Sequence, residues 1–301
     1  MKKVVIVDTF NFLHRAFHAI PKSFRAPDNT PTNAVYGVSS MLISLIKETN
    51  PDCVIAALDS QKPTFRSEEF SNYKAQRKEM DEELKIQIPM VFNAIDLIGI
   101  YKLNCEGYEA DDIIGTLVKK LKDDAEIYIV SNDKDMWQLL DKNVFVLIPN
   151  TKGGFEKIDE EEANKRLEFD KKYLIDFKAL RGDTSDNIPG VYGIGEVTAK
   201  KLIEKYKTVE EIYKNIEEIT PESLKKKLVE SVEIAYLSKK LATIITDAPI
   251  RFNLNDCIFK FYPTPELVDY FTKLNFKSIL RRLNVNIDEK QKVTEDQPSL
   301  F

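Results

Sequence analysis

Three aspartates stand just after short apolar runs that have the composition of buried β-strands. They are Asp8 after residues 4–7, Asp59 after residues 54–58 and Asp133 after residues 127–130. If these strands are parallel, their carboxyl ends meet at one edge of a sheet, where ligands bind in such folds. Three like charges gathered there are costly unless cations compensate them. Each aspartate alone could equally cap the helix that follows it, because Asp is favoured at N-caps and in turns.

Six further acids are closely spaced near the expected starts of helices and turns. They are Glu109, Asp111 and Asp112 in EADD, Asp135 in DKD, and Asp183 and Asp186 in RGDTSDN. Acids in a first turn also suit the helix macrodipole, so a purely structural interpretation stays open. Acids two residues apart, however, place two oxygens within reach of one hard cation. Nine carboxylates exceed the direct needs of two Mg²⁺ ions, so some of them would act through bound water.

The predicted metal site is suited to one kind of chemistry. Two divalent ions about 4 Å apart would support in-line displacement at a phosphodiester. Mg²⁺ is the expected ion, and Mn²⁺ would substitute for it. Other sites fit poorly, because no glycine-rich phosphate loop ends in Gly-Lys-Ser/Thr. His14 and His18 have helical spacing, but neither a further His nor a neighbouring Cys could complete a zinc site.

A glycine-rich turn follows the last two acids and leads into an expected helix. Gly190, Gly193 and Gly195 allow a tight turn and a close approach of a DNA backbone to the amides at the helix start. Lys200 and Lys201 follow on that helix. This pattern is typical of a helix–hairpin–helix, which grips phosphates without reading bases. The alternative is an ordinary packing corner between two helices.

A long polar insertion at residues 61–85 follows Asp59. Within it, Lys74, Arg77 and Lys78 would share one face of a helix, with Tyr73 beside them. A basic helix that borders an acidic pocket could draw a strand across it, and Tyr73 would offer a stacking surface. The alternative is a solvated charged face.

The acids need elements that carry them to one edge, and the apolar pattern predicts such elements. Strands are expected at residues 4–7, 54–58, 127–130 and 144–148, and helices at residues 33–49, 86–98 and 110–121. Alternating strands and helices predict right-handed crossovers and an α/β fold with a parallel central sheet flanked by helices. From about residue 160 helices dominate, with strand-like runs only at residues 250–253 and 258–261.

We therefore expect three parts. Residues 1–164 would form the α/β metal-site domain with its arch-like insertion, residues 165–285 a mainly helical region that contains the helix–hairpin–helix, and residues 286–301 a flexible tail.

The composition is that of an ordinary globular protein, with 43% hydrophobic and 31% charged residues. The net charge of −5 does not exclude DNA, because a block of carboxylates would hide a basic surface in the total. No apolar run is long enough to span a bilayer, and no signal peptide precedes residue 4. Cys53, Cys105 and Cys257 are isolated and suggest neither a disulfide framework nor a zinc site. A reducing, cytoplasmic location and a monomer are expected.

Five blocks of the chain match one family in the family's own order. The blocks are VDTFNFLHRAFHA, TFRSEEFSNYKAQR, YEADDIIGTL, SNDKDMWQLL and RGDTSDNIPGVYGIGEVTA. Over about residues 3–283 the chain resembles the 5′-nuclease domain of bacterial DNA polymerase I, and through it the wider flap endonuclease family. The resemblance implies a structure-specific 5′ nuclease, both a 5′–3′ exonuclease and a flap endonuclease. It would hydrolyse DNA at 5′ flaps or 5′ ends by a two-metal mechanism in replication and repair, near the nucleoid.

The resemblance also assigns roles to residues. The first metal group would be Asp8, Asp59, Glu109, Asp111 and Asp112, and the second Asp133, Asp135, Asp183 and Asp186. The residues expected to contact the scissile strand are Arg15, Arg66, Tyr73, Lys74 and Arg77. Among these, Lys74 and Arg77 would neutralise charge on the phosphate in the transition state. The hairpin would hold duplex DNA, with a K⁺ ion on its carbonyls. Thr9 departs from the family, which usually has Gly there.

Two other functions remain open. An RNA-directed nuclease of similar architecture would need fewer acids and no hairpin, so residues 183–200 argue against it. For a non-catalytic binder of branched DNA, nine acids would be a needless electrostatic cost. Whether the chain is a stand-alone protein or a fragment of a longer polymerase is also open.

The end of the chain carries a separate hypothesis. Gln297, Leu300 and Phe301 resemble the Gln-x-x-Leu-Phe peptide with which bacterial replication proteins dock on the sliding clamp. Two adjacent apolar side chains on a polar tail could enter a partner's pocket. The alternatives are a chance apolar ending and a linker to another domain.

Overall fold

A computed structural model describes residues 1–77, 79–150 and 154–285 of the chain. Its centre is a six-stranded sheet in the order β3-β2-β1-β4-β5-β6. The strands are β1 (Lys2–Asp8), β2 (Cys53–Ala57), β3 (Tyr101–Leu103), β4 (Ala125–Val130), β5 (Val144–Pro149) and β6 (Phe155–Ile158). Strands β1 to β5 pair in parallel, whereas β6 pairs antiparallel with β5 at one edge. The predicted parallel sheet is confirmed, and β3 and β6 are strands that were not predicted.

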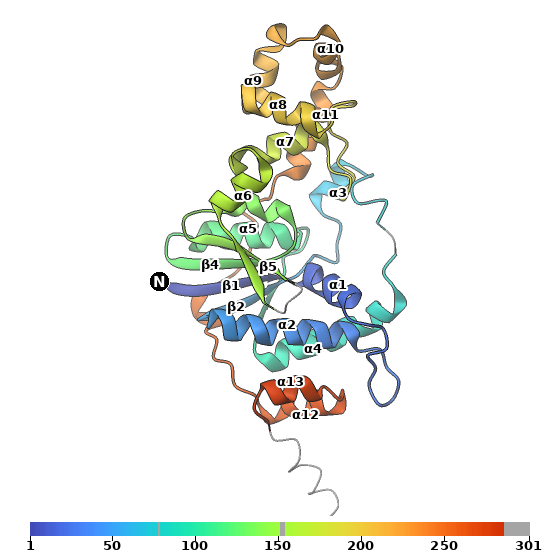
Figure 1. The fold of residues 1–301 in the computed structure, drawn as a ribbon, viewed down its shortest axis with the longest axis vertical. Helices are drawn as coiled ribbons and strands as arrows, with labels where there is room; N and C mark the ends of the chain where they lie inside the picture. Colours follow the sequence, from blue (N-terminus) through green and yellow to red (C-terminus); the bar gives the residue numbers. More distant parts are fainter. Residues whose placement is uncertain (78, 151–153, 286–301) are drawn as a thin grey trace, which may run out of the picture.

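The central strand β1 is buried on both faces, which explains its unbroken apolar run. Val4 and Ile6 point into one core, and Val5 and Val7 into the other. This alternation is the period of two that strand geometry imposes. Helices therefore cover both faces of the sheet, and the strand ends remain at the edges (Figure 1).

On one face lie α5 (Ala110–Leu121) and η1 (Lys134–Leu139). The other face packs against α1, α2 and α4. These are α1 (Thr9–Ala19), α2 (Asn33–Thr49) and α4 (Glu82–Ile98). Asp8 caps α1, and its carboxylate accepts a hydrogen bond from the backbone of Asn11. The strand-to-helix turn thus holds this aspartate at the carboxyl edge.

The helical region expected after residue 164 is present as a succession of short helices (Figure 1). They are α6 (Glu160–Leu167), η2 (Lys171–Tyr173), α7 (Leu174–Arg181), α8 (Glu196–Tyr206), α9 (Val209–Lys214), η3 (Ile216–Glu218), α10 (Glu222–Glu230) and α11 (Val232–Ala242). Helices α10 and α11 follow each other directly and are divided at Ser231. The strand-like runs at residues 250–253 and 258–261 form no strand. Instead, η4 (Leu254–Cys257) lies between them.

The last two helices leave that region and return to the sheet. They are α12 (Pro265–Lys273) and α13 (Lys277–Arg282), which pack beside α4 and α2. Tyr270 donates a hydrogen bond to the carbonyl of Met90, which fixes α12 on α4. Within the described ranges, no helix is both long and apolar enough to cross a membrane.

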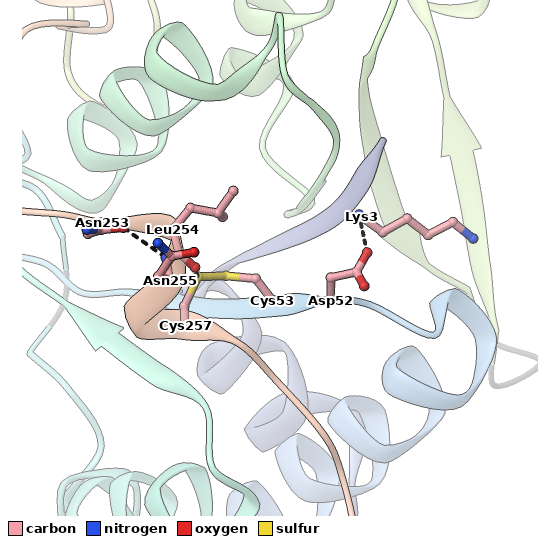
Figure 2. The surroundings of a disulfide bond; sticks show 7 residues. All are labelled: Lys3, Asp52, Cys53, Asn253, Leu254, Asn255 and Cys257. Carbon is pink, nitrogen blue, oxygen red and sulfur yellow. Dashed lines mark hydrogen bonds between the residues drawn. A yellow bond between two sulfur atoms is a disulfide. The ribbon is translucent and has the colours of Figure 1, made fainter.

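A disulfide joins Cys53 at the start of β2 to Cys257 at the end of η4 (Figure 2). The expectation that the cysteines are unpaired is therefore wrong for these two, and only Cys105 is free. The two partners are 204 residues apart, so no local spacing could reveal the pair. A backbone hydrogen bond from Phe259 to Asp52 continues the contact, which anchors the chain before it reaches α12.

Candidate metal and DNA site

Four of the nine acids line one cavity at the carboxyl edge of the sheet. Asp8 ends β1, Asp59 and Asp133 follow β2 and β4, and Asp111 lies in the first turn of α5. The cavity has a volume of about 1430 Å³ and continues past α1 to Lys74 and Arg77. The predicted convergence of strand-end acids is thus what the parallel register produces.

The charges of these acids are poorly compensated. Burial, followed by the charges of Asp8 and Asp133, raises the pKa of Asp111 well above its ordinary value. Among the residues that the structure describes, the Asp111 carboxylate accepts no hydrogen bond and forms no ion pair. Burial, followed by Asp59 and Asp133, raises the pKa of Asp8 to about 7, although Ser131 donates a hydrogen bond to it. A cation in the cavity would relieve this repulsion.

The donor set fits a hard divalent cation. Carboxylate oxygens from four separate segments face one cavity, and Mg²⁺ prefers such oxygens together with water. In the described part of the chain, no three His, Cys, Asp or Glu side chains stand close enough to form a finished metal site. The fit therefore rests on the type and charge of the donors. His14 and His18 line the same cavity, and burial, followed by His18, lowers the pKa of His14.

The second acid group contains a cation that we did not expect. Lys178 on α7 forms ion pairs with Asp135 and with Asp183, the latter at 2.5 Å between Nζ and Oδ2. The residue is 7% exposed, and lysine is rarely that buried unless it is paired. Burial raises the pKa of Asp135 to about 7 despite Lys178, whereas Lys178 holds the pKa of Asp183 at about 2 against the opposing effect of burial. The sequence signal was a lysine flanked by apolar residues in the segment 177–180, five positions before Asp183.

The base of the insertion is docked on the acids. Lys74 Nζ lies 2.7 Å from Oε2 of Glu109, and Arg77 lies 2.8 Å from Oδ1 of Asp186. The hydroxyl of Tyr73 donates to Glu109 at 3.1 Å. Tyr73 is 7% exposed, so its ring is not the open stacking surface that we expected.

The expected basic helix is also absent, because residues 71–76 form turns. Lys74 has a left-handed backbone (φ 55°), and its N–H bonds to the carbonyl of Asp186 instead of a preceding turn. Lys78 lies outside the described residues. A short helix, α3 (Phe65–Glu69), precedes these turns.

Arg66 and Asp112 differ most from their expected roles. Their side chains are 3% and 0% exposed, and the guanidinium binds both carboxylate oxygens at 2.8 Å. Neither group faces the cavity. Arg15 does line it, and its guanidinium donates to Asn132 and to the carbonyl of Pro149.

The glycine-rich turn has the conformation that the hairpin needs. Gly190 and Gly193 have φ values of +64° and +73°, and Gly195 precedes α8 as its N-cap. A Cβ at Gly190 would stand 2.2 Å from the backbone nitrogen of Gly182, so only glycine fits there. Sequence reasoning missed Tyr192, which is 87% exposed at the tip of the turn.

The lysines near the turn differ in their exposure and in their contacts. Lys201 is exposed, whereas Lys200 forms ion pairs with Glu168 and Glu196. The ammonium of Lys227 donates to the carbonyl of Gly193 at 3.2 Å. Gln297, Leu300 and Phe301, the residues of the clamp hypothesis, lie outside the described part of the chain.

Two family models match the chain. Residues 3–174 match the N-terminal resolvase-like domain of 5′-3′ exonucleases, and residues 169–264 match their C-terminal SAM fold. DNA polymerase I of Caldicellulosiruptor bescii is 41% identical over 290 residues, which cover 94% of this chain and 34% of the relative. DNA polymerase I of Bacillus subtilis is 37% identical over 294 residues, or 96% of this chain and 33% of the relative. The chain thus spans about a third of the length of the curated relatives it matches.

A solved structure supports the fold. The bacteriophage T5 D15 flap endonuclease, in a pseudo-enzyme-product complex with DNA and metal ions, superposes with a TM-score of 0.68. The alignment covers 94% of this chain and 100% of the other, at 23% identity. At this identity the likeness shows the fold alone.

Proposed function

Because the chain belongs to the 5′-3′ exonuclease family, we propose that it hydrolyses DNA phosphodiesters at 5′ ends and 5′ flaps. Residues 1–164 would carry most of the metal site, and residues 165–285 would add Asp183 and Asp186 to it and hold the duplex. The role would lie in replication and repair, as the relatives named DNA polymerase I suggest.

One observation carries this proposal. The carboxylates of Asp8, Asp59, Asp111 and Asp133 share a cavity with the cations Lys74 and Arg77. The carboxylates supply oxygen donors for divalent ions, and the cations suit a phosphate that must lie against them. A pure binder of branched DNA would gain nothing from uncompensated carboxylates at its DNA surface, which disfavours that alternative.

Two Mg²⁺ ions, or Mn²⁺ in their place, would supply a water of lowered pKa and would neutralise charge at the scissile phosphate. Asp8, Asp59, Glu109 and Asp111 are the proposed holders of the first ion, some of them through water. Asp133, Asp135, Asp183 and Asp186 are the proposed holders of the second.

The remaining groups would orient the DNA. Lys74 and Arg77 would turn from Glu109 and Asp186 to the phosphate, where they stabilise the charge that develops in the transition state. Arg15 would contact the strand in the cavity. Tyr192 and the amides at the start of α8 would meet the duplex backbone.

Three further assignments belong to the same proposal. A K⁺ ion at the hairpin would have to displace the Lys227 ammonium from the Gly193 carbonyl. The tail residues 297–301 would dock on the bacterial sliding clamp. The protein would act as a monomer in the cytoplasm, near the nucleoid.

Cleavage of flap, nicked and single-stranded DNA in Mg²⁺ tests the function directly. Asp111→Asn should abolish cleavage and leave DNA affinity intact or higher, because it removes both a metal ligand and a negative charge that faces phosphate. Asp123→Asn is the matched control, since this exposed aspartate precedes β4 at the opposite edge of the sheet. Cleavage by Asp111→Asn at the rate of the control would refute the metal assignment.

A further inference from the structure

We propose that Arg66 and Asp112 are a positioning pair. Together they would hold the base of the insertion, the start of α5 and the chain after α11 in one geometry. In this view neither residue binds metal or DNA directly. The consequence for cleavage rests on the proposed nuclease function, whereas the placement of the pair does not.

Four of the five N–H donors of the Arg66 guanidinium bind protein acceptors. Nε donates to the carbonyl of Leu241 at 2.9 Å, and one terminal nitrogen donates to the carbonyl of Thr243 at 2.8 Å. Both terminal nitrogens also bind Asp112. The remaining N–H is on the nitrogen that lies 3.8 Å from Oε2 of Glu109. Since the side chain is only 3% exposed, a DNA phosphate has no access to the guanidinium.

The carboxylate of Asp112 is saturated, because each of its oxygens accepts two hydrogen bonds. Besides the two bonds from Arg66, Oδ1 accepts from the N–H of Ile245 at 2.9 Å. Its Oδ2 accepts from the N–H of Glu109 at 3.2 Å, as part of the capping box of α5. A carboxylate has about four acceptor sites, so no lone pair is left for a metal ion.

Helix geometry separates Asp112 from its neighbour. Successive residues of an α-helix point about 100° apart, so Asp111 and Asp112 cannot face the same side. Asp111 faces the cavity, and Asp112 faces Arg66 on the inner side. Because both lie in the first turn, a shift of the Asp112 contact moves the Asp111 carboxylate as well.

The pair joins three segments that come from distant parts of the sequence. Arg66 lies in α3, a few residues before Tyr73 and Lys74. Residues 241–245 lead out of α11, which packs on α7 near the second acid group. The bonds of one buried guanidinium thus fix the base of the insertion, the first acid group and the helical region relative to one another.

Arg66→Lys separates positioning from DNA contact. A lysine keeps the charge and could replace a phosphate contact, but it cannot reproduce the planar fork of donors. We expect Arg66→Lys and Arg66→Gln to lose about a hundredfold in the single-turnover rate, because misplacement of catalytic groups by about 1 Å costs that much. DNA affinity in Ca²⁺ and its salt dependence should remain those of the wild type. Two results would make Arg66 a phosphate contact and overturn the proposal. One is a wild-type rate in Arg66→Lys, and the other is a slope of log affinity against log salt concentration that is smaller by about one in Arg66→Gln.

Manganese binding separates positioning from ligation. Asp111→Asn should lose a bound Mn²⁺ equivalent in a spin-resonance titration, whereas Asp112→Asn should keep the wild-type number. Loss of one equivalent in Asp112→Asn would show that it is a ligand. These binding results do not need cleavage, so an inactive wild type would refute the proposed function and leave the placement of the pair testable.

A double variant distinguishes a loss of positioning from a loss of folding. Removal of one partner leaves a buried charge without its counter-ion. The double variant Arg66→Met/Asp112→Leu replaces the whole pair by apolar groups of similar size and should fold. Circular dichroism would establish its fold. We expect this folded variant to cleave as slowly as Arg66→Gln, and a wild-type rate would overturn the positioning role.

Discussion

The disulfide between Cys53 and Cys257 permits a quantitative prediction of stability. It closes a loop with a sequence separation of 204 residues, and it ties β2 to the segment that leads to α12 and α13. In the chain-entropy description, a cross-link of this length removes unfolded-state entropy worth about 5 kcal/mol at 25 °C. For a chain of 301 residues this free energy corresponds to a melting temperature that is higher by about 8 °C.

Reduction of the protein should therefore lower the melting temperature by most of this difference, and it should also lower the urea concentration at the unfolding midpoint. Cys257→Ala should have the stability of the reduced wild type, because both lack the cross-link. Cys105→Ser is the control, since Cys105 is free and partly exposed, and it should respond to reductant as the wild type does. Mass spectrometry under non-reducing conditions would establish that the bond is present.

Two results would refute this reasoning. If the oxidised and reduced proteins unfold at the same urea concentration, the bond adds nothing to the packing of η4 on β2. If the non-reduced protein carries three free thiols, the two sulfurs are neighbours that do not form a bond. In either case the backbone contact between Phe259 and Asp52 would have to hold this segment by itself.

Three further predictions concern the site. Lys74→Ala should slow single-turnover cleavage more than it weakens DNA binding, because Lys74 is placed to act on the transition state; a loss confined to affinity would make it a phosphate anchor. The pKa of Asp8 is about 7 in the fold but 3.8 ordinarily, so ionisation destabilises the metal-free fold increasingly as pH rises between these values. In EDTA the melting temperature should therefore rise as the pH falls from about 7 to about 5, Mg²⁺ should remove this trend, and a flat profile in EDTA would contradict the reasoning. Lys178→Met should lower metal-free stability and enlarge the rise in melting temperature that Mg²⁺ produces, because Asp135 and Asp183 lose their internal cation; a smaller rise than in the wild type would contradict this.

Much of the fold followed from local sequence. The apolar runs at β1, β2, β4 and β5 are long enough, and spaced widely enough, that only a sheet with helical crossovers accommodates them. An acid at the end of a parallel strand must then lie at the carboxyl edge, as Asp8 does. The turn at Gly190 was predictable because glycines 190, 193 and 195 are closely spaced and allow a tight turn, and the positive φ of Gly190 agrees with it.

Local sequence could not decide which acids face the cavity. Asp111 and Asp112 are adjacent and chemically identical, and both could be ligands by spacing. They differ because Arg66, which lies in α3 and 46 residues before Asp112, binds Asp112 and not Asp111. Lys178 likewise gains its role only where α7 lies beside η1.

The same limit applies to Tyr73 and to the cysteines. The spacing of the basic residues predicted a basic helix with an exposed Tyr73 ring, but the turn at residues 71–76 docks on Asp186 and buries the ring. Cys53 and Cys257 meet because η4 packs on the start of β2, 204 residues away. The sequence by itself determined the strands β1, β2, β4 and β5, the strand-end acids and the glycine turn, since these depend on neighbours in the chain. Only the tertiary structure decided burial, pairing and orientation, because these depend on which distant segments pack together.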